Sequence, residues 1–388
     1  VLTSISIFIL VGCGSGGGTS TPTVASFELL DPNAAANNRF GDTTVILANG
    51  NIVVVNPYDD TAASNAGAVH LFNPFTKTVV ASFYGDDADD NIGLIITLGG
   101  SFDFFGITAL ANNNFVIASP YDDVNSLSNA GSVMLINGTT GAQIKTIAGD
   151  TANDKLGSGS DDNGGYSSVT ALGNNNFVIA SAYDDVNSVV NAGSVMLVNG
   201  ATGAQIKTIA GDTENDYLGH TSVTALGNNN FVIASLFDDD GATTVDAGSV
   251  MLINGATGVQ IGTTLVGDTE DDYLGGSSVT ALGNNNFVIA SSWDDVNSVV
   301  NAGSVMLVNG ATGAQIGTTL AGDTQNDYLG GNRVTALGNN NFVIASTGDD
   351  VNGVVNAGSV MLINGATRAQ IGTTLAGDTA QDKLGYSS

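Results

Sequence analysis

The 388-residue sequence predicts an all-β fold, a β-propeller of six four-stranded blades. The first observation behind this prediction is a repeat. The segment "NNNFVIAS" occurs at 174–181 and returns in four further copies, and "NGNIVVVN" at 49–56 is a diverged sixth. The second observation is that each copy lies in a unit of roughly 55 to 63 residues. Every unit contains four short strand-like runs separated by Gly, Asn and Asp, and none has a helical period.

One unit shows the four runs, named A to D, in their order. Run A is "SVTAL" at 168–172 and run D is "QIKTIA" at 205–210, and both alternate between polar and apolar residues. Run B, "FVIA" at 177–180, and run C, "VMLV" at 195–198, are apolar throughout. Two such central strands predict a sheet that is covered on both faces. Four-stranded meanders stacked around an axis provide this cover, whereas the alternative, a β-helix, has much shorter repeats.

The number of strand-like runs predicts six blades and one additional strand that belongs to none of them. Runs A, B and C occur six times, but D-like runs occur seven times, because "VASFELL" at 24–30 precedes the first unit. We expect a closed ring of six blades over residues 23–388, with either Val24–Leu30 or the copy near Gln370–Leu375 left over. The spare strand could pair with another molecule. The alternative is a seventh blade, completed by residues beyond Ser388, with Val24–Leu30 as its fourth strand.

The order of the runs resembles the FG-GAP repeat of integrin-α-type propellers. Repeats of that family begin with an aromatic-Gly pair, which is followed by a strand, an acidic loop and a Gly-led strand. In one copy of this chain Leu274-Gly275 is followed by "SVTAL", "FVIASSWDD" and "AGSVMLV" in the same order. The resemblance implies calcium bound between runs A and B, where this chain has only "GNNN" at 283–286. The amino-acid sequence of the repeat is also similar to that of bacterial surface-protein repeats of unassigned function.

The first residues resemble a bacterial lipoprotein signal peptide. The apolar run "SISIFILVGC" ends in Leu10-Val11-Gly12-Cys13, and it is too short for an ordinary transmembrane helix. The resemblance implies that residues 1–12 are removed, that Cys13 carries lipid and that residues 13–22 are a flexible tether. The protein would then be held on a bacterial membrane, at the cell surface or outside the cell. The alternative is an ordinary secretory signal.

The charge of the chain is strongly negative and is expected to gather on one side. Eight Lys and Arg face 37 Asp and Glu, so nucleic acid is excluded as a partner. A meander puts the A–B and C–D turns on one side, here called the turn face, and the B–C and D–A loops on the other, the acidic face. Of the acidic residues only Glu28 lies outside the B–C loops, D–A loops and the segments that enter them.

A recurring spacing on the acidic face suggests calcium sites. Asp212, Glu214 and Asp216 have the spacing D-x-E-x-D, and carboxylates at alternate loop positions suit the flexible oxygen coordination of Ca²⁺. The same candidates recur in the next two units: Asp268, Glu270, Asp272, Asp323 and Asp327. The alternative is that these residues cap turns and keep the protein soluble.

Aromatic residues precede the acidic pair of the B–C loop in five units. They are Tyr58, Tyr121, Tyr183, Phe237 and Trp293. Such rings either form a ligand-binding face that stacks on a glycan or cap the core where strand B ends.

No set of residues points to catalysis. His70 occupies the strand-C position that five methionines hold elsewhere, so we interpret it as a core substitution. The acidic pairs repeat in every unit, whereas an enzyme normally needs one asymmetric site. The sequence therefore predicts a non-catalytic adhesion or binding module for a glycan, a surface protein or calcium. The alternative is a subunit that binds copies of itself and forms an extracellular filament or coat by strand exchange.

Overall fold

The computed structural model describes residues 4–10, 24–35, 37–95, 104–158, 169–221, 223–239, 244–331 and 334–386. Within these ranges the regular elements are all β-strands, and no helix long and apolar enough to cross a membrane is found there. The strands form six four-stranded antiparallel sheets and two strand pairs. The prediction of an all-β propeller of six four-stranded blades is thus confirmed.

Each blade is a meander of four consecutive strands, A to D. Blades 1 to 3 are β3 (Thr44–Ile46), β4 (Ile52–Asn56), β5 (Ala68–Asn73), β6 (Thr78–Tyr84); β9 (Ile107–Ala109), β10 (Phe115–Ser119), β11 (Ser132–Ile136), β12 (Gln143–Ala148); and β13 (Val169–Ala171), β14 (Phe177–Ser181), β15 (Ser194–Val198), β16 (Gln205–Ala210). Blades 4 to 6 are β17 (Thr224–Ala225), β18 (Phe231–Ser235), β19 (Ser249–Ile253), β20 (Leu265–Val266); β21 (Ser278–Ala281), β22 (Phe287–Ser291), β23 (Ser304–Val308), β24 (Leu320–Ala321); and β25 (Val334–Ala336), β26 (Phe342–Ser346), β27 (Ser359–Ile363), β28 (Leu375–Ala376). The first pair is β1 (Ser4–Leu10) with β2 (Val24–Leu30), and the second is β7 (Leu94–Ile95) with β8 (Phe104–Phe105).

Strand B is apolar on both sides because it lies between two neighbouring blades. In blade 3, Phe177 and Ile179 pack in one cluster with residues of blade 2 such as Val116. Val178 and Ala180, on the opposite side of the same strand, pack in a second cluster with blade 4. The joints from blade 2 onward therefore bury a Phe and Ile face against a Val and Ala face, and at the first joint the second face is formed by Val53 and Val55.

Polar contacts between the inner strands reinforce these joints. The hydroxyl of Thr170 in β13 donates a hydrogen bond to the carbonyl of Val223, just before β17, at 3.3 Å. Thr224 repeats this contact with Val279 of the next blade at 3.2 Å. The A strands thus follow one another along the inside of the blade array.

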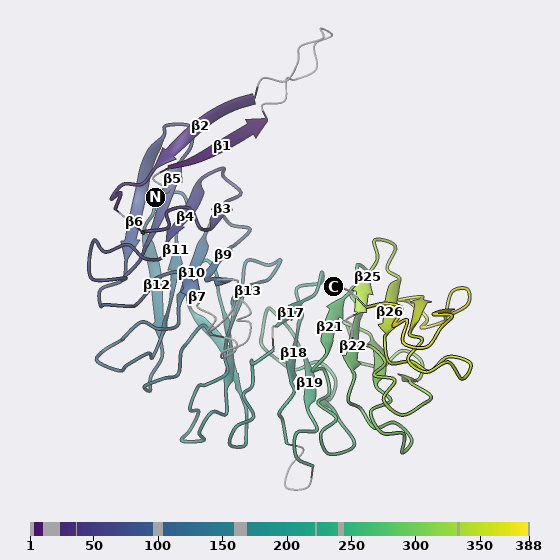
Figure 1. The fold of residues 1–388 in the computed structure, drawn as a ribbon. Coiled ribbons are helices and arrows are strands. Elements are labelled where there is room, and N and C mark those ends of the chain that lie inside the picture. Colours follow the sequence, from purple (N-terminus) through teal and green to yellow (C-terminus); the bar gives the residue numbers. More distant parts are fainter. Residues whose placement is uncertain are drawn as a thin grey trace.

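The blades form an open arc, not the closed ring that we predicted. Figure 1 shows blade 1 and blade 6 at opposite ends of the arc. In blade 6, Leu337 is 36% exposed, whereas its equivalent in blade 5, Leu282, is 3% exposed. The face of blade 1 that would receive blade 6 is already occupied, because Leu29 and Phe40 pack on Ile52 of that face. The N-terminal segment thus covers this face of blade 1 at one end of the arc.

The strand left over from the six blades is β2. It was one of the two candidates, and it pairs with β1 along its whole length, while the C-terminal candidate contributes β28 to blade 6. Cys13 and the tether at 13–22 lie outside the described residues, so lipidation of Cys13 stays a prediction.

Candidate cation-binding clusters on the acidic face

The turn face is held together by asparagines of the repeated "NNN". Asn174 and Asn176, in the A–B turn of blade 3, both donate their side-chain amides to the carbonyl of Gly255 in the C–D turn of blade 4, at 3.0 and 2.8 Å. Equivalent pairs reach Gly138, Gly200, Gly310 and Gly365 at the other joints. The repeated asparagines therefore serve the contact between blades.

On the acidic face, one carboxylate of the predicted calcium spacing holds its own loop. Asp216 is 1% exposed, and its Oδ2 accepts the backbone N–H groups of Asp212 and Thr213 at 2.9 and 2.8 Å. The Thr213 hydroxyl donates to the other oxygen, Oδ1. Asp272 and Asp327 accept the equivalent bonds from Thr269 and Thr324. These buried aspartates fix the D–A loop in a turn whose backbone N–H groups converge on one carboxylate.

The third carboxylate of each cluster comes from the B–C loop of the following blade. Carboxylate oxygens of Asp212, Asp216 and Asp238 lie within 4.8 Å of one another. The same arrangement recurs as Asp268–Asp272–Asp294, Asp150–Asp154–Asp184 and Asp86–Asp90–Asp122. Asp323, Asp327 and Asp349 line the equivalent hollow at the last joint. Several places on the acidic face thus offer three oxygen ligands to one metal ion.

The carboxylates that form each cluster in the structure differ in part from those that the D-x-E-x-D spacing predicted. Asp212 and Asp216 come together, as do Asp268 and Asp272, but Glu214 and Glu270 are exposed and are not members of these two groups. The residues that replace them, Asp238 and Asp294, are the first members of the B–C acidic pairs. Their presence on the acidic face was predicted, but their approach to the D–A loop depends on how two blades dock.

Half-buried carboxylates in these clusters resist ionisation. Burial, reinforced by the charges of Asp216 and Asp212, raises the pKa of Asp238 to about 6. Burial likewise raises the pKa of Asp294 to about 6, with Asp272 and Asp268 as charged neighbours. Burial also raises the pKa of Asp90 to about 6. At neutral pH each cluster therefore concentrates negative charge that a cation would neutralise.

The aromatic residues of the B–C loops pack mainly on aromatic residues of the D–A loops. Tyr217 contacts Tyr183 and Phe237 edge to face, with ring centroids 5.7 and 5.9 Å apart. Phe237 also contacts Tyr273 at 6.1 Å. Trp293 contacts a tyrosine too, but it is 52% exposed, which makes it the ring best placed to meet a ligand.

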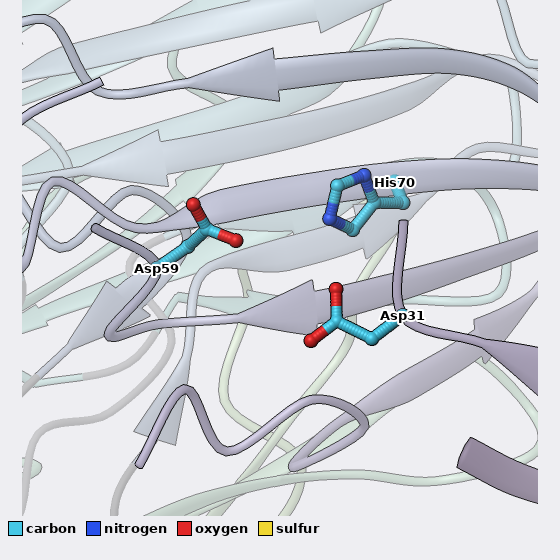
Figure 2. A group of neighbouring side chains, drawn as sticks. All are labelled: Asp31, Asp59 and His70. Carbon is cyan, nitrogen blue, oxygen red and sulfur yellow. The ribbon is translucent and has the colours of Figure 1, made fainter. Parts of the chain in front are cut away.

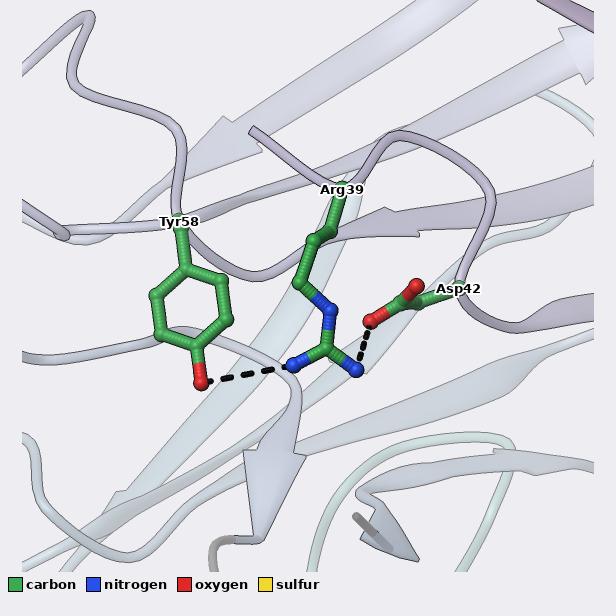
Figure 3. A network of polar contacts seen from close by, with 3 residues as sticks. All are labelled: Arg39, Asp42 and Tyr58. Atoms are coloured by element: carbon green, nitrogen blue, oxygen red, sulfur yellow. Dashed lines mark hydrogen bonds and ion pairs between the residues drawn. The ribbon is translucent and has the colours of Figure 1, made fainter. Parts of the chain in front are cut away.

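Cations contact the rings of Tyr58 and Tyr183. The Arg39 guanidinium lies 5.3 Å from the centre of the Tyr58 ring and is also paired with Asp42 (Figure 3). The Lys155 ammonium lies 5.0 Å from the centre of the Tyr183 ring. Tyr121 is half-buried. Capping and packing at the end of strand B therefore account for most of these aromatics.

The fold and the acidic joints define a propeller built from one repeat, and the family comparison agrees. The chain belongs to the family described as "Repeat of unknown function (DUF5650)", whose model matches residues 46–93, 109–163, 171–219, 225–276, 281–331 and 336–386. The FG-GAP likeness stays a resemblance in the order of elements.

No curated protein matches the chain. Among solved structures the chain is similar to that described as "The crystal structure of BamB from Moraxella catarrhalis". The sequence identity is 12% and the TM-score 0.42, over 92% of this chain and 81% of that one.

Proposed function

We propose that the chain is a non-catalytic binding module of the bacterial cell surface, and that its acidic face binds Ca²⁺ at the joints between blades. The observation that carries the proposal is the triad of carboxylates that recurs at successive joints, as in Asp212, Asp216 and Asp238. Carboxylates that are half-buried and close together repel one another, and a divalent cation relieves this repulsion.

The chemistry of the triad also indicates how a partner would bind. Calcium takes six to eight oxygen ligands, and three carboxylates fill only part of that number. The remaining positions are open to water, to neighbouring hydroxyls of a sugar or to a carboxylate of a surface protein. Trp293 offers an exposed ring near the Asp294 triad on which a sugar could stack. The same site at every joint suits repeated, multivalent contact better than catalysis.

Thermal unfolding with and without calcium tests this function. Millimolar CaCl₂ should raise the Tm above its value in EDTA, because a ligand of the native state stabilises it. Asp238→Asn should reduce that rise. The matched control is Glu214→Gln, a neighbouring acidic residue outside the triad, which should leave the rise unchanged. A Tm that is the same in CaCl₂ and EDTA would refute calcium binding at the joints.

The position at the cell surface rests on the N-terminal resemblance. If Cys13 is acylated, the protein from its native host should partition into detergent, and Cys13→Ser should release it into the aqueous phase. A Cys13→Ser protein that still partitions into detergent would contradict the lipid anchor.

A second candidate function, self-assembly, is favoured by the last blade. Val343, Ala345, Val360 and Leu362 of blade 6 are partly exposed, although their equivalents in blade 3 are buried against the next blade. An apolar sheet face of this kind is matched to another blade of the same repeat. If residues 1–12 are cleaved, β2 also loses its partner β1, and its free edge could pair with a second copy.

A further inference from the structure

A buried polar cluster beside blade 1 includes a histidine, whereas the acidic triads named above at the later joints consist of aspartates alone. His70 in β5 takes the place of the methionine found at this position of strand C in the other blades. Figure 2 shows its ring facing the carboxylates of Asp31 and Asp59. The exposed fractions of Asp31, Asp59 and His70 are 8, 1 and 0%. One atom from each of the three lies within 4.8 Å of the others.

The imidazole of His70 is oriented as a metal ligand would be. Its Nδ1 lies 2.8 Å from the hydroxyl oxygen of Ser82, so a proton on Nδ1 can be donated there. The lone pair then lies on Nε2, which is buried, points toward the two carboxylates and has no hydrogen-bond partner among the described residues. A second hydrogen bond that fixes the ring in this way is typical of metal-bound histidines.

Two buried asparagines lie beside the carboxylate of Asp59. Asn56 donates its side-chain amide to Asp59 Oδ2 at 2.9 Å, and Asn38 approaches the same oxygen at 3.5 Å. The Oδ1 atoms of Asn38 and Asn56 are buried and, within the described part of the chain, accept no hydrogen bond. The cluster thus holds several electron-rich atoms without a donor. Buried acceptors that lack partners are costly, and a cation held by the two carboxylates would satisfy the free nitrogen of His70.

We propose that Asp31, Asp59 and His70 bind one divalent transition-metal ion of the zinc class. An imidazole nitrogen beside carboxylates suits zinc and its neighbours, whereas calcium prefers oxygen ligands alone. Ligands about 2.1 Å from a tetrahedral zinc lie about 3.4 Å from one another. Atoms within 4.8 Å therefore need only a small inward movement to share one ion.

The ion would fasten the N-terminal segment to the end of the propeller. Asp31 follows β2, while Asp59 and His70 belong to blade 1. Leu29 and Phe40 from the same N-terminal segment cover the apolar face of this blade. The bound ion would therefore hold in place the segment that covers this end of the arc. In blade 4, Met251 lines the equivalent hollow with Asp212, Asp216 and Asp238, and its thioether gives no comparable nitrogen ligand.

Zinc retention by the whole chain tests the proposal. The protein is stripped with EDTA, incubated with ZnCl₂ in millimolar CaCl₂ to occupy the acidic joints, desalted and analysed for metal content. We expect one zinc ion per chain. His70→Met, which introduces the residue of the other blades, should fold and lose this ion. Asp238→Asn, which alters a carboxylate triad elsewhere, should keep it.

Nitrogen NMR of the imidazole rings provides a second measurement that does not depend on the stability of a variant. The chain has only two histidines, His70 and His220, so His220→Gly assigns both signals. Zinc should shift the Nε2 resonance of His70 and leave that of His220 unchanged. The proposal is overturned if the wild-type chain retains no zinc, if His70→Met retains as much as wild type, or if the His70 resonance does not move. The cluster would then be satisfied by a proton on Asp31 or by water.

Discussion

The side-chain amide of Asn176 in blade 3 lies 2.8 Å from the carbonyl oxygen of Gly255 in blade 4 and donates a hydrogen bond to it. Asn174 donates to the same oxygen, so one carbonyl accepts two amides from the neighbouring blade. Because Asn176 is buried, its amide would be left without this partner if the contact broke, and the carbonyl would keep only the amide of Asn174.

Asn176→Ala should therefore lower the free energy of unfolding by about 1–3 kcal/mol, since it leaves a buried carbonyl with one donor fewer. Urea unfolding monitored by circular dichroism measures the change. The matched control is Asn341→Ala in blade 6, the last blade of the described arc. A loss at Asn341 as large as the loss at Asn176 would contradict the assignment of these asparagines to the joints.

Asp216 and Asp212 should differ sharply when each is replaced by alanine in EDTA. Asp216 accepts two backbone N–H bonds and a hydroxyl bond, so its loss should cost about 2–3 kcal/mol. Asp212 is exposed and its removal relieves repulsion within the triad, so Asp212→Ala should cost little. Differential scanning calorimetry of the two variants measures these losses of stability. Equal losses would mean that Asp216 does not hold the loop.

The carboxylate triads should make the metal-free protein more stable in mild acid than at neutral pH. Asp90, Asp238 and Asp294 have pKa values raised from 3.8 to about 6, so the folded state binds more protons between these values than the unfolded state does. The stability that these groups contribute is full below about pH 4 and is lost as the pH rises through 6. We expect a higher Tm at pH 5 than at pH 7.5 in EDTA. A Tm that falls steadily between pH 7.5 and 5 would contradict this.

His70 should partly offset the rise in Tm that we expect between pH 7.5 and pH 5. Comparison with His70→Met should show this effect. Its pKa is lowered from 6.5 to about 4, so its neutral form stabilises the fold above pH 6.5 and this contribution is lost as the pH falls toward 4. The full shift corresponds to about 3 kcal/mol. In EDTA the rise in Tm from pH 7.5 to pH 5 should therefore be larger for His70→Met than for wild type. An identical rise in both proteins would count against a buried neutral His70.

The exposed face of blade 6 should govern association between molecules. Leu362→Asp should fold, because this face is partly exposed, and it should abolish concentration-dependent association in sedimentation velocity. Leu197→Asp, the same change at the buried equivalent in blade 3, should prevent folding. A wild-type protein that stays monomeric at all concentrations would exclude this face as a contact between copies.

The blades were predictable from the sequence because continuous apolar runs such as residues 177–180 fit only a sheet that is covered on both sides. The partners of polar residues were not predictable in the same way. Asn176 and Gly255 are 79 positions apart, so the role of "NNN" depends on the docking of two blades. The approach of Asp238 to Asp216 has the same origin.

The sequence did not predict the polar neighbours of His70 or the open arc, because both depend on contacts between segments that are distant in the sequence. A histidine at a methionine position indicates a core residue, and His70 is indeed buried. Its relation to Asp31 becomes visible only when the N-terminal segment folds onto blade 1. The same segment brings Phe40 onto the face that would have closed the ring, and nothing in the local pattern of residues 24–40 distinguishes it from an ordinary D–A segment.

The joint between Asn176 and Gly255 also bears on how genes for such proteins change. Each blade contacts its neighbours through the same few residues, so one whole unit can be duplicated or lost while every remaining joint keeps its partners. Recombination between the nearly identical coding segments would lengthen or shorten the arc in steps of one blade. Blade 1, with its N-terminal cover, would have to stay first in the arc.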